Sequence, residues 1–105
     1  MAVQERHEQL AERLRKAEQA RALLKDLERR LKEDGRPDLE RLLAQLDRLA
    51  GPLPETDRIR WFIESAVGSA RMDRAGKAGT DVSRSRSAIE GEISTLRGTL
   101  DHGVT

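Results

Sequence analysis

The residues able to perform acid–base or metal chemistry are scattered along the chain and form no recognisable motif. His7 and His102 lie near opposite ends, and neither has a second histidine three or four residues away, as a helical metal site requires. The chain has no cysteine, which excludes disulfides, thiolate catalysis and cysteine-ligated zinc. Neither Gly-x-Ser-x-Gly nor His-Glu-x-x-His occurs. The sequence therefore predicts a protein that is not an enzyme and that has no metal or cofactor.

Carboxylates are the most frequent groups with acid–base capacity, with 19 Asp and Glu among the 105 residues. Catalysis needs two such groups held together in a pocket. Here several stand four residues before a basic residue, as Glu12 does before Lys16 and Asp26 before Arg30. On a helix this spacing gives surface ion pairs that each contribute about 0.2–0.5 kcal/mol. We therefore interpret these carboxylates as helix surface.

One segment carries a local excess of positive charge. Residues 68–88 contain five basic and two acidic residues, and three serines alternate with the last basic ones. Basic, hydroxyl-rich segments suit contacts with a phosphate backbone. This segment supports an alternative function, that of a nucleic-acid-associated regulatory protein. Its candidate phosphate contacts are Arg71, Arg74, Lys77, Arg84 and Arg86.

The overall charge argues against strong attraction to a polyanion. Lys and Arg number 20, so the net charge is +1, and residues 1–50 and 51–105 are each nearly balanced. Strong binding of nucleic acid or of an anionic membrane normally requires a clear basic excess. The chain also contains no apolar run of about 20 residues and no apolar segment at its start. We expect a cytoplasmic protein with no membrane segment.

The composition and apolar spacing predict an all-α fold. Leucine and alanine, both strong helix formers, are frequent, whereas Trp61 and Phe62 are the only aromatic residues. Apolar residues recur every three or four positions, which is the period of an amphipathic helix. We predict three to four amphipathic helices, a long N-terminal helix followed by a helical hairpin or bundle, in a single domain spanning residues 1–105. The expected helices cover residues 2–33, 37–50, 55–72 and 82–101, with a flexible loop at 73–81 and a disordered tail at 102–105.

The lengths of the first two helices predict that the first needs a further partner. At about 1.5 Å per residue the first spans about 48 Å and the second only about 20 Å. An antiparallel second helix covers Leu24 to Leu31 but does not reach Leu10, Leu14 and Ala17. Helix 3, helix 4 or another chain must cover this half. We expect dimerisation to complete the bundle, with these three residues at the partner interface.

The third helix has two apolar sides. Its core stripe includes Phe62 and Ile63, whereas Trp61 points almost opposite and falls in line with Met72. One interpretation places Trp61 against a neighbouring helix of the same chain. The other places Trp61 and Met72 at a partner interface, because tryptophan is enriched at binding hot spots. Both interpretations stay open from the sequence.

The fourth helix combines a regular apolar seam with a face of small residues. Its apolar positions from Val82 to Leu100 follow the heptad spacing of a coiled coil, with Arg86 at one of them. Gly91 and Gly98 lie on the opposite face, although glycine inside a helix costs about 0.5–1 kcal/mol relative to alanine. Either another helix approaches closely there, or the helix orders only on binding. We count both glycines among the predicted interface residues.

Taken together, these patterns predict a non-enzymatic helical protein–protein interaction module. We expect it to be an adaptor, regulator or inhibitor that forms a homodimer and binds a further, unidentified protein. The alternative is the nucleic-acid-associated protein described above. Arginine outnumbers lysine 16 to 4 and alanine is frequent, which is typical of proteins from GC-rich bacterial genomes.

Overall fold

Four helices make up almost all of the residues that the structure describes. The computed structural model describes residues 2–33, 38–72 and 76–102. Helix α1 covers Ala2–Leu31, α2 covers Leu39–Ala50, α3 covers Arg58–Met72 and α4 covers Ala78–Asp101. No strand occurs among these residues. The predicted all-α class and the number of helices are therefore confirmed.

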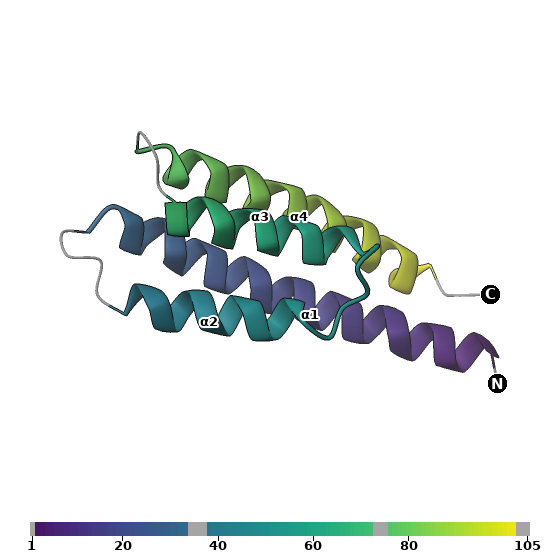
Figure 1. The fold of residues 1–105 in the computed structure, drawn as a ribbon. Coiled ribbons are helices and arrows are strands. Elements are labelled where there is room, and N and C mark those ends of the chain that lie inside the picture. Colours follow the sequence, from purple (N-terminus) through teal and green to yellow (C-terminus); the bar gives the residue numbers. More distant parts are fainter. Residues whose placement is uncertain (1, 34–37, 73–75, 103–105) are drawn as a thin grey trace.

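The helices form an up-down-up-down bundle (Figure 1). Each helix runs opposite to the one before it, so both chain ends lie at the same end of the molecule. α1 packs mainly against α4 and α2, and α3 packs mainly against α4 and α2, which leaves α2 and α4 on a diagonal. The molecule measures 50 × 21 × 20 Å, and its long axis matches the length of α1, about 45 Å for 30 residues.

Local backbone chemistry moves two helix starts away from their predicted positions. Asp38 has a positive φ of 59°, which is incompatible with a right-handed helix. α2 therefore starts at Leu39 and not at residue 37. At α3, the Asp57 carboxylate accepts a hydrogen bond of 2.9 Å from the Ile59 backbone N–H. This is the geometry of a helix N-cap, so α3 starts at Arg58 and not at residue 55.

α4 starts four residues before the predicted position. Residues 78–81, expected in the loop, are helical, whereas positions 73–75 of that loop lie outside the described residues. Ala78 is buried, as is Val82 one turn later. This burial offsets the low helix propensity of Gly79, so the helix extends through a position where local sequence alone favours a loop. In the predicted tail, the backbone N–H of His102 still bonds to the carbonyl of Gly98 at 3.1 Å.

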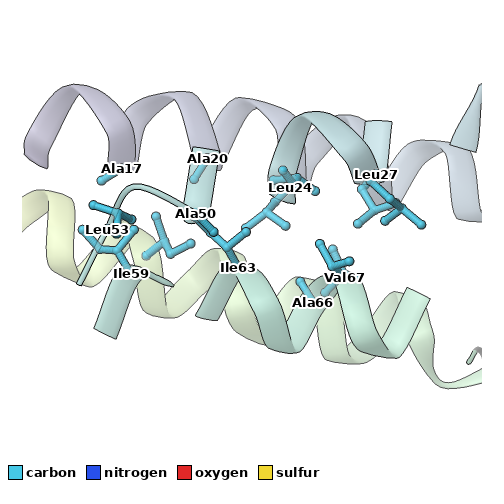
Figure 2. Close-up of a cluster of buried hydrophobic side chains, with 14 of the residues drawn as sticks. Ala17, Ala20, Leu24, Leu27, Ala50, Leu53, Ile59, Ile63, Ala66 and Val67 are labelled. Atoms are coloured by element: carbon cyan, nitrogen blue, oxygen red, sulfur yellow. The ribbon is translucent and has the colours of Figure 1, made fainter. Parts of the chain in front are cut away.

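The predicted apolar stripes meet in one core along the bundle axis (Figure 2). Leu24 and Leu27 of α1 are fully buried, as are Leu43 of α2 and Ile63 of α3. Each leucine or isoleucine buried in this way stabilises the fold by about 1.5–3 kcal/mol. The labelled side chains of Figure 2 show α1, α3 and the segment around Leu53 contributing to the same cluster.

The N-terminal half of α1 is covered within the chain. Ala17 is fully buried, and Leu10 and Leu14 are partly buried against the core. The C-terminal half of the 24-residue α4 runs antiparallel beside this part of α1, and Arg97 of α4 bonds to Glu18 at 2.6 Å. The fold therefore does not need a second chain to bury Ala17. Dimerisation remains a prediction.

Candidate functional site

The apolar side chains left outside the core lie on the outward side of α3. Trp61 is 64% exposed and Met72 is 67% exposed, and they are the exposed large hydrophobic residues of the described chain. The opposite side of α3 buries Ile59 and Ile63 completely. Trp61 therefore lies outside the core, on the side of α3 that borders α4. The strip predicted to link Trp61 and Met72 does face outward.

Trp61 stands at the edge of a shallow groove between α3 and α4. We call it the α3–α4 groove. Its ring contacts the ring of Phe62 edge-to-face, with centroids 5.5 Å apart at 71°, and Phe62 packs against the core. The indole is thus supported from below while its outer side is open. The groove is lined by Trp61, Phe62, Ser65, Ser69, Asp81, Arg84, Ser85 and Ala88.

The groove differs from the rest of the surface in size and charge of its side chains. Four of its eight lining residues are serine or alanine. Two of the eight are charged, a smaller share than the 37% of the whole chain. It holds one acid, Asp81, and one base, Arg84. Neither side chain has an ion-pair or hydrogen-bond partner within residues 2–33, 38–72 and 76–102. The two charges are therefore available to an incoming surface.

Helix α4 also presents open glycines. A Cβ atom placed on Gly91 or Gly98 would have no neighbour within 4 Å, and the same is true of Gly68 on α3. Within the described part of the chain, no other helix therefore approaches Gly91 or Gly98 closely. Contact of these glycines with a partner remains a prediction.

The five predicted phosphate contacts do not form one patch. Arg71 pairs with Asp47 of α2 at 2.9 Å, whereas Arg86 pairs with Glu28 of α1 and with Glu90. Lys77 and Arg84 are exposed, and Arg74 lies outside the described residues. Arg71 and Arg86 point toward different helices, α2 and α1, whereas Arg84 pairs with neither within the described residues. The charge excess that is continuous in sequence is thus divided in space.

A partly buried ion cluster that sequence reasoning missed joins three helices at the start of α3. Arg13 of α1 donates two hydrogen bonds of 2.9 Å to Asp57 and one of 3.4 Å to Glu92 of α4. Arg58 lies 3.8 Å from the same Glu92. Arg13 and Asp57 lie 44 positions apart in the sequence, so no local pattern signals this pair.

The electrostatics of this cluster favour the charged forms. Burial by itself raises the pKa of Asp57. The hydrogen bonds from Arg13 and from the Ile59 N–H together lower this pKa by more than burial raises it, so the pKa lies below its usual value. The hydrogen bond to Asp57 raises the pKa of Arg13. Each carboxylate is held by a guanidinium, which makes the cluster a structural tie between α1, α3 and α4.

The described residues contain no group of three or more His, Cys, Asp or Glu side chains placed to hold a metal ion. None of the described helices has the length and apolar character needed to span a membrane.

Comparison of the chain with protein-family models, with curated proteins and with solved structures gave no match.

Proposed function

We propose that this protein is a non-enzymatic helical module that binds other proteins, including a second copy of itself, through the outward side of α3. The observation that carries the proposal is the exposure of Trp61 and Met72 on one side of a helix whose other side forms the core. Tryptophan buries a large area on binding and is enriched among the residues that dominate interface energies. An aromatic residue held at the edge of a groove of small side chains suits such a contact.

The state of the ionisable groups supports binding over catalysis. The most buried carboxylate of the ion cluster, Asp57, is already bonded to Arg13 and to the start of α3. A general acid or base needs a proton-exchanging group that faces a substrate site. The groups whose pKa is shifted instead belong to ion pairs: Arg13, Asp57 and Arg86 pair between helices, and the others pair along one helix.

The alternative is a nucleic-acid-associated regulator that uses Lys77 and Arg84. Both side chains are exposed near the N-terminus of α4. The alternative loses support because Arg71 and Arg86 are bonded to carboxylates of α2 and α1. A contact with phosphates would have to break these pairs or rely on the remaining cations.

The proposal is tested by the mass of the protein in solution. Light scattering after size exclusion, over a series of micromolar concentrations, is expected to give a mass that rises toward twice the 11.8 kDa monomer. Retention on heparin is expected to be weak and to vanish at physiological salt. A monomer at every concentration would overturn the self-association. Submicromolar affinity for duplex DNA at physiological salt would favour the alternative.

A further inference from the structure

We infer that the α3–α4 groove is the face on which two copies of this chain meet, related by a two-fold axis that crosses the bundle perpendicular to its helices. The inference rests on the proposed function, because it specifies how the self-association occurs. In this arrangement α3 faces α3 of the partner and α4 faces α4 of the partner, each pair running antiparallel.

The charges of the groove are complementary to themselves. A two-fold interface brings one surface against its own copy, so every charge must meet the opposite charge of the same set. The groove offers one acid and one base, Asp81 and Arg84, which have no partner within the described chain. An antiparallel α4 pair centred between them places Asp81 of each copy opposite Arg84 of the other. A strongly acidic or basic partner would find no net charge here.

The exposed apolar residues point to the same axis. Trp61 and Met72 lie 11 positions apart on α3, so an antiparallel α3 pair centred between residues 66 and 67 sets each Trp61 against the partner's Met72. A thioether beside an aromatic ring is a favourable contact. The side chains between them, at Ser65, Gly68 and Ser69, are small enough for two helices to approach closely.

The two centres lie at the same level of the bundle. α3 ends at Met72 and α4 starts at Ala78, and the two helices run antiparallel (Figure 1). A residue of α3 and a residue of α4 that are the same number of positions from residue 75 therefore lie at about the same height along the bundle axis. By this count residues 66–67 of α3 lie level with residues 83–84 of α4. The charge pairs require a centre between residues 82 and 83, one residue or about 1.5 Å away. A single axis therefore satisfies the apolar pair and the charge pair together.

The size of the face sets the expected strength of the dimer. The 15-residue α3 is about 22 Å long, and two helices side by side are about 20 Å wide, so the face measures roughly 450 Å² per copy. Stable interfaces bury about 800 Å² per partner, and smaller ones are typical of transient contacts. We expect a reversible dimer with a dissociation constant in the micromolar range.

Charge reversal on one helix tests the pairing. In a two-fold dimer, Arg84→Asp creates two contacts between acids, and Asp81→Arg creates two contacts between bases. Each variant is therefore expected to dimerise at least about tenfold more weakly than the parent chain in sedimentation equilibrium. An equimolar mixture of the two variants brings acids opposite bases again and is expected to regain association. Arg41→Asp on α2, diagonally across the bundle, is the matched control and is expected to leave the dissociation constant unchanged. Circular dichroism checks that each variant keeps its helix content.

Engineered cysteines test the register independently, since the chain has no cysteine of its own. Positions 65 and 68 are symmetric about the same centre as positions 61 and 72. A mixture of Ser65→Cys and Gly68→Cys chains is therefore expected to form disulfide-linked dimers faster than either variant alone. Equal rates in all three samples would overturn the proposed axis.

The outcomes separate this inference from the proposed function. If the parent chain dimerises but both reversed variants dimerise equally well, the α3–α4 groove is not the contact face, and self-association must use another surface, such as the groove around Leu23 and Leu49. If the single variants are monomeric and their mixture stays monomeric, the Asp81–Arg84 pairing is overturned. If the parent chain itself never dimerises, the proposed self-association falls with it.

Discussion

At the scale of single residues, the side chains that stabilise the fold are different from those that we expect to bind a partner. Arg13 and Asp57 act between helices and are largely enclosed, whereas Trp61 lies outside the core. Loss of the first pair is therefore expected to affect stability, and loss of Trp61 is expected to affect association. Two substitutions test this separation.

Asp57→Asn is expected to destabilise the fold by about 1–3 kcal/mol at neutral pH, because it removes the carboxylate charge that faces Arg13 and the oxygen that accepts the hydrogen bond from Arg13 Nε. Asparagine keeps the ability to cap α3, so the variant isolates the ion pair. The pKa of Asp57 is lower in the folded than in the unfolded state. Its contribution to the free energy of unfolding is therefore fully present above the unfolded pKa, about 4, and is lost as the pH falls through the folded pKa. Urea unfolding at neutral and acidic pH measures the difference between variant and parent. A difference that stays constant down to pH values well below 4 would contradict this account.

Trp61→Ala is expected to change the free energy of unfolding of the monomer by no more than about 0.5 kcal/mol, as is usual for exposed positions. The same change is expected to weaken dimerisation by about thirtyfold, the equivalent of roughly 2 kcal/mol. Thermal unfolding followed by circular dichroism gives the first quantity and sedimentation equilibrium gives the second. A loss of several kcal/mol in stability would show that Trp61 supports the core after all.

At the scale of the helices, α4 is the element whose sequence fits its monomeric environment least well. Its inner side buries Val82, Ile89 and Ile93, but its outer side carries glycines in open space. Glycine weakens a helix because the unfolded chain loses more conformational freedom when it is fixed. The stability of α4 therefore comes from its packing against α1 and α3 and not from its own propensity.

Gly91→Ala and Gly98→Ala are each expected to stabilise the monomer by about 0.5–1 kcal/mol, since the added methyl group meets no atom of the chain. Gly98 lies C-terminal to the proposed contact face, so we expect Gly98→Ala to leave the dimer dissociation constant unchanged. Gly91 lies at the edge of that face, seven residues after Arg84 on the same side of α4. Denaturant unfolding and light scattering measure the two effects. Weaker association of Gly98→Ala would place this glycine in the contact, as the sequence suggested.

At the scale of the whole molecule, the bundle is complete within one chain. Its radius of gyration is 14.9 Å, above the roughly 13 Å of a spherical domain of this length, because α1 and α4 are long and the cross-section is narrow. All four helices contribute buried side chains to one core. The chain therefore has the means to fold without a partner.

We accordingly expect the monomer obtained on dilution to keep its helix content and to unfold cooperatively. Circular dichroism at concentrations below the dimer dissociation constant is the measurement, with far-ultraviolet signal per residue compared across the dilution series. The dimer is expected to add stability only by mass action at higher concentration. A helical signal that falls on dilution would mean that folding and association are coupled.

The sequence by itself determined the class of the fold and much of its core. Helical periodicity is local, so the stripes that contain Leu24, Leu43, Ile63 and Ile89 could be predicted to be buried, and all four are. The same periodicity placed Trp61 and Met72 together on the side of α3 away from the core. These predictions succeeded because each depends only on the angle between neighbouring positions of one helix.

Only the tertiary structure decided which surface covers which. The sequence left three candidates for the cover over Ala17. The structure buries Ala17 within the chain, with Leu53 and Ile59 beside it (Figure 2) and with α4 running antiparallel along α1. The bond from Arg13 to Asp57, and the groove that sets Asp81 and Arg84 beside Trp61, likewise join residues far apart in the chain. Periodicity within a helix fixes its faces but carries no information about the order and direction in which helices pack, and that arrangement determines the candidate site.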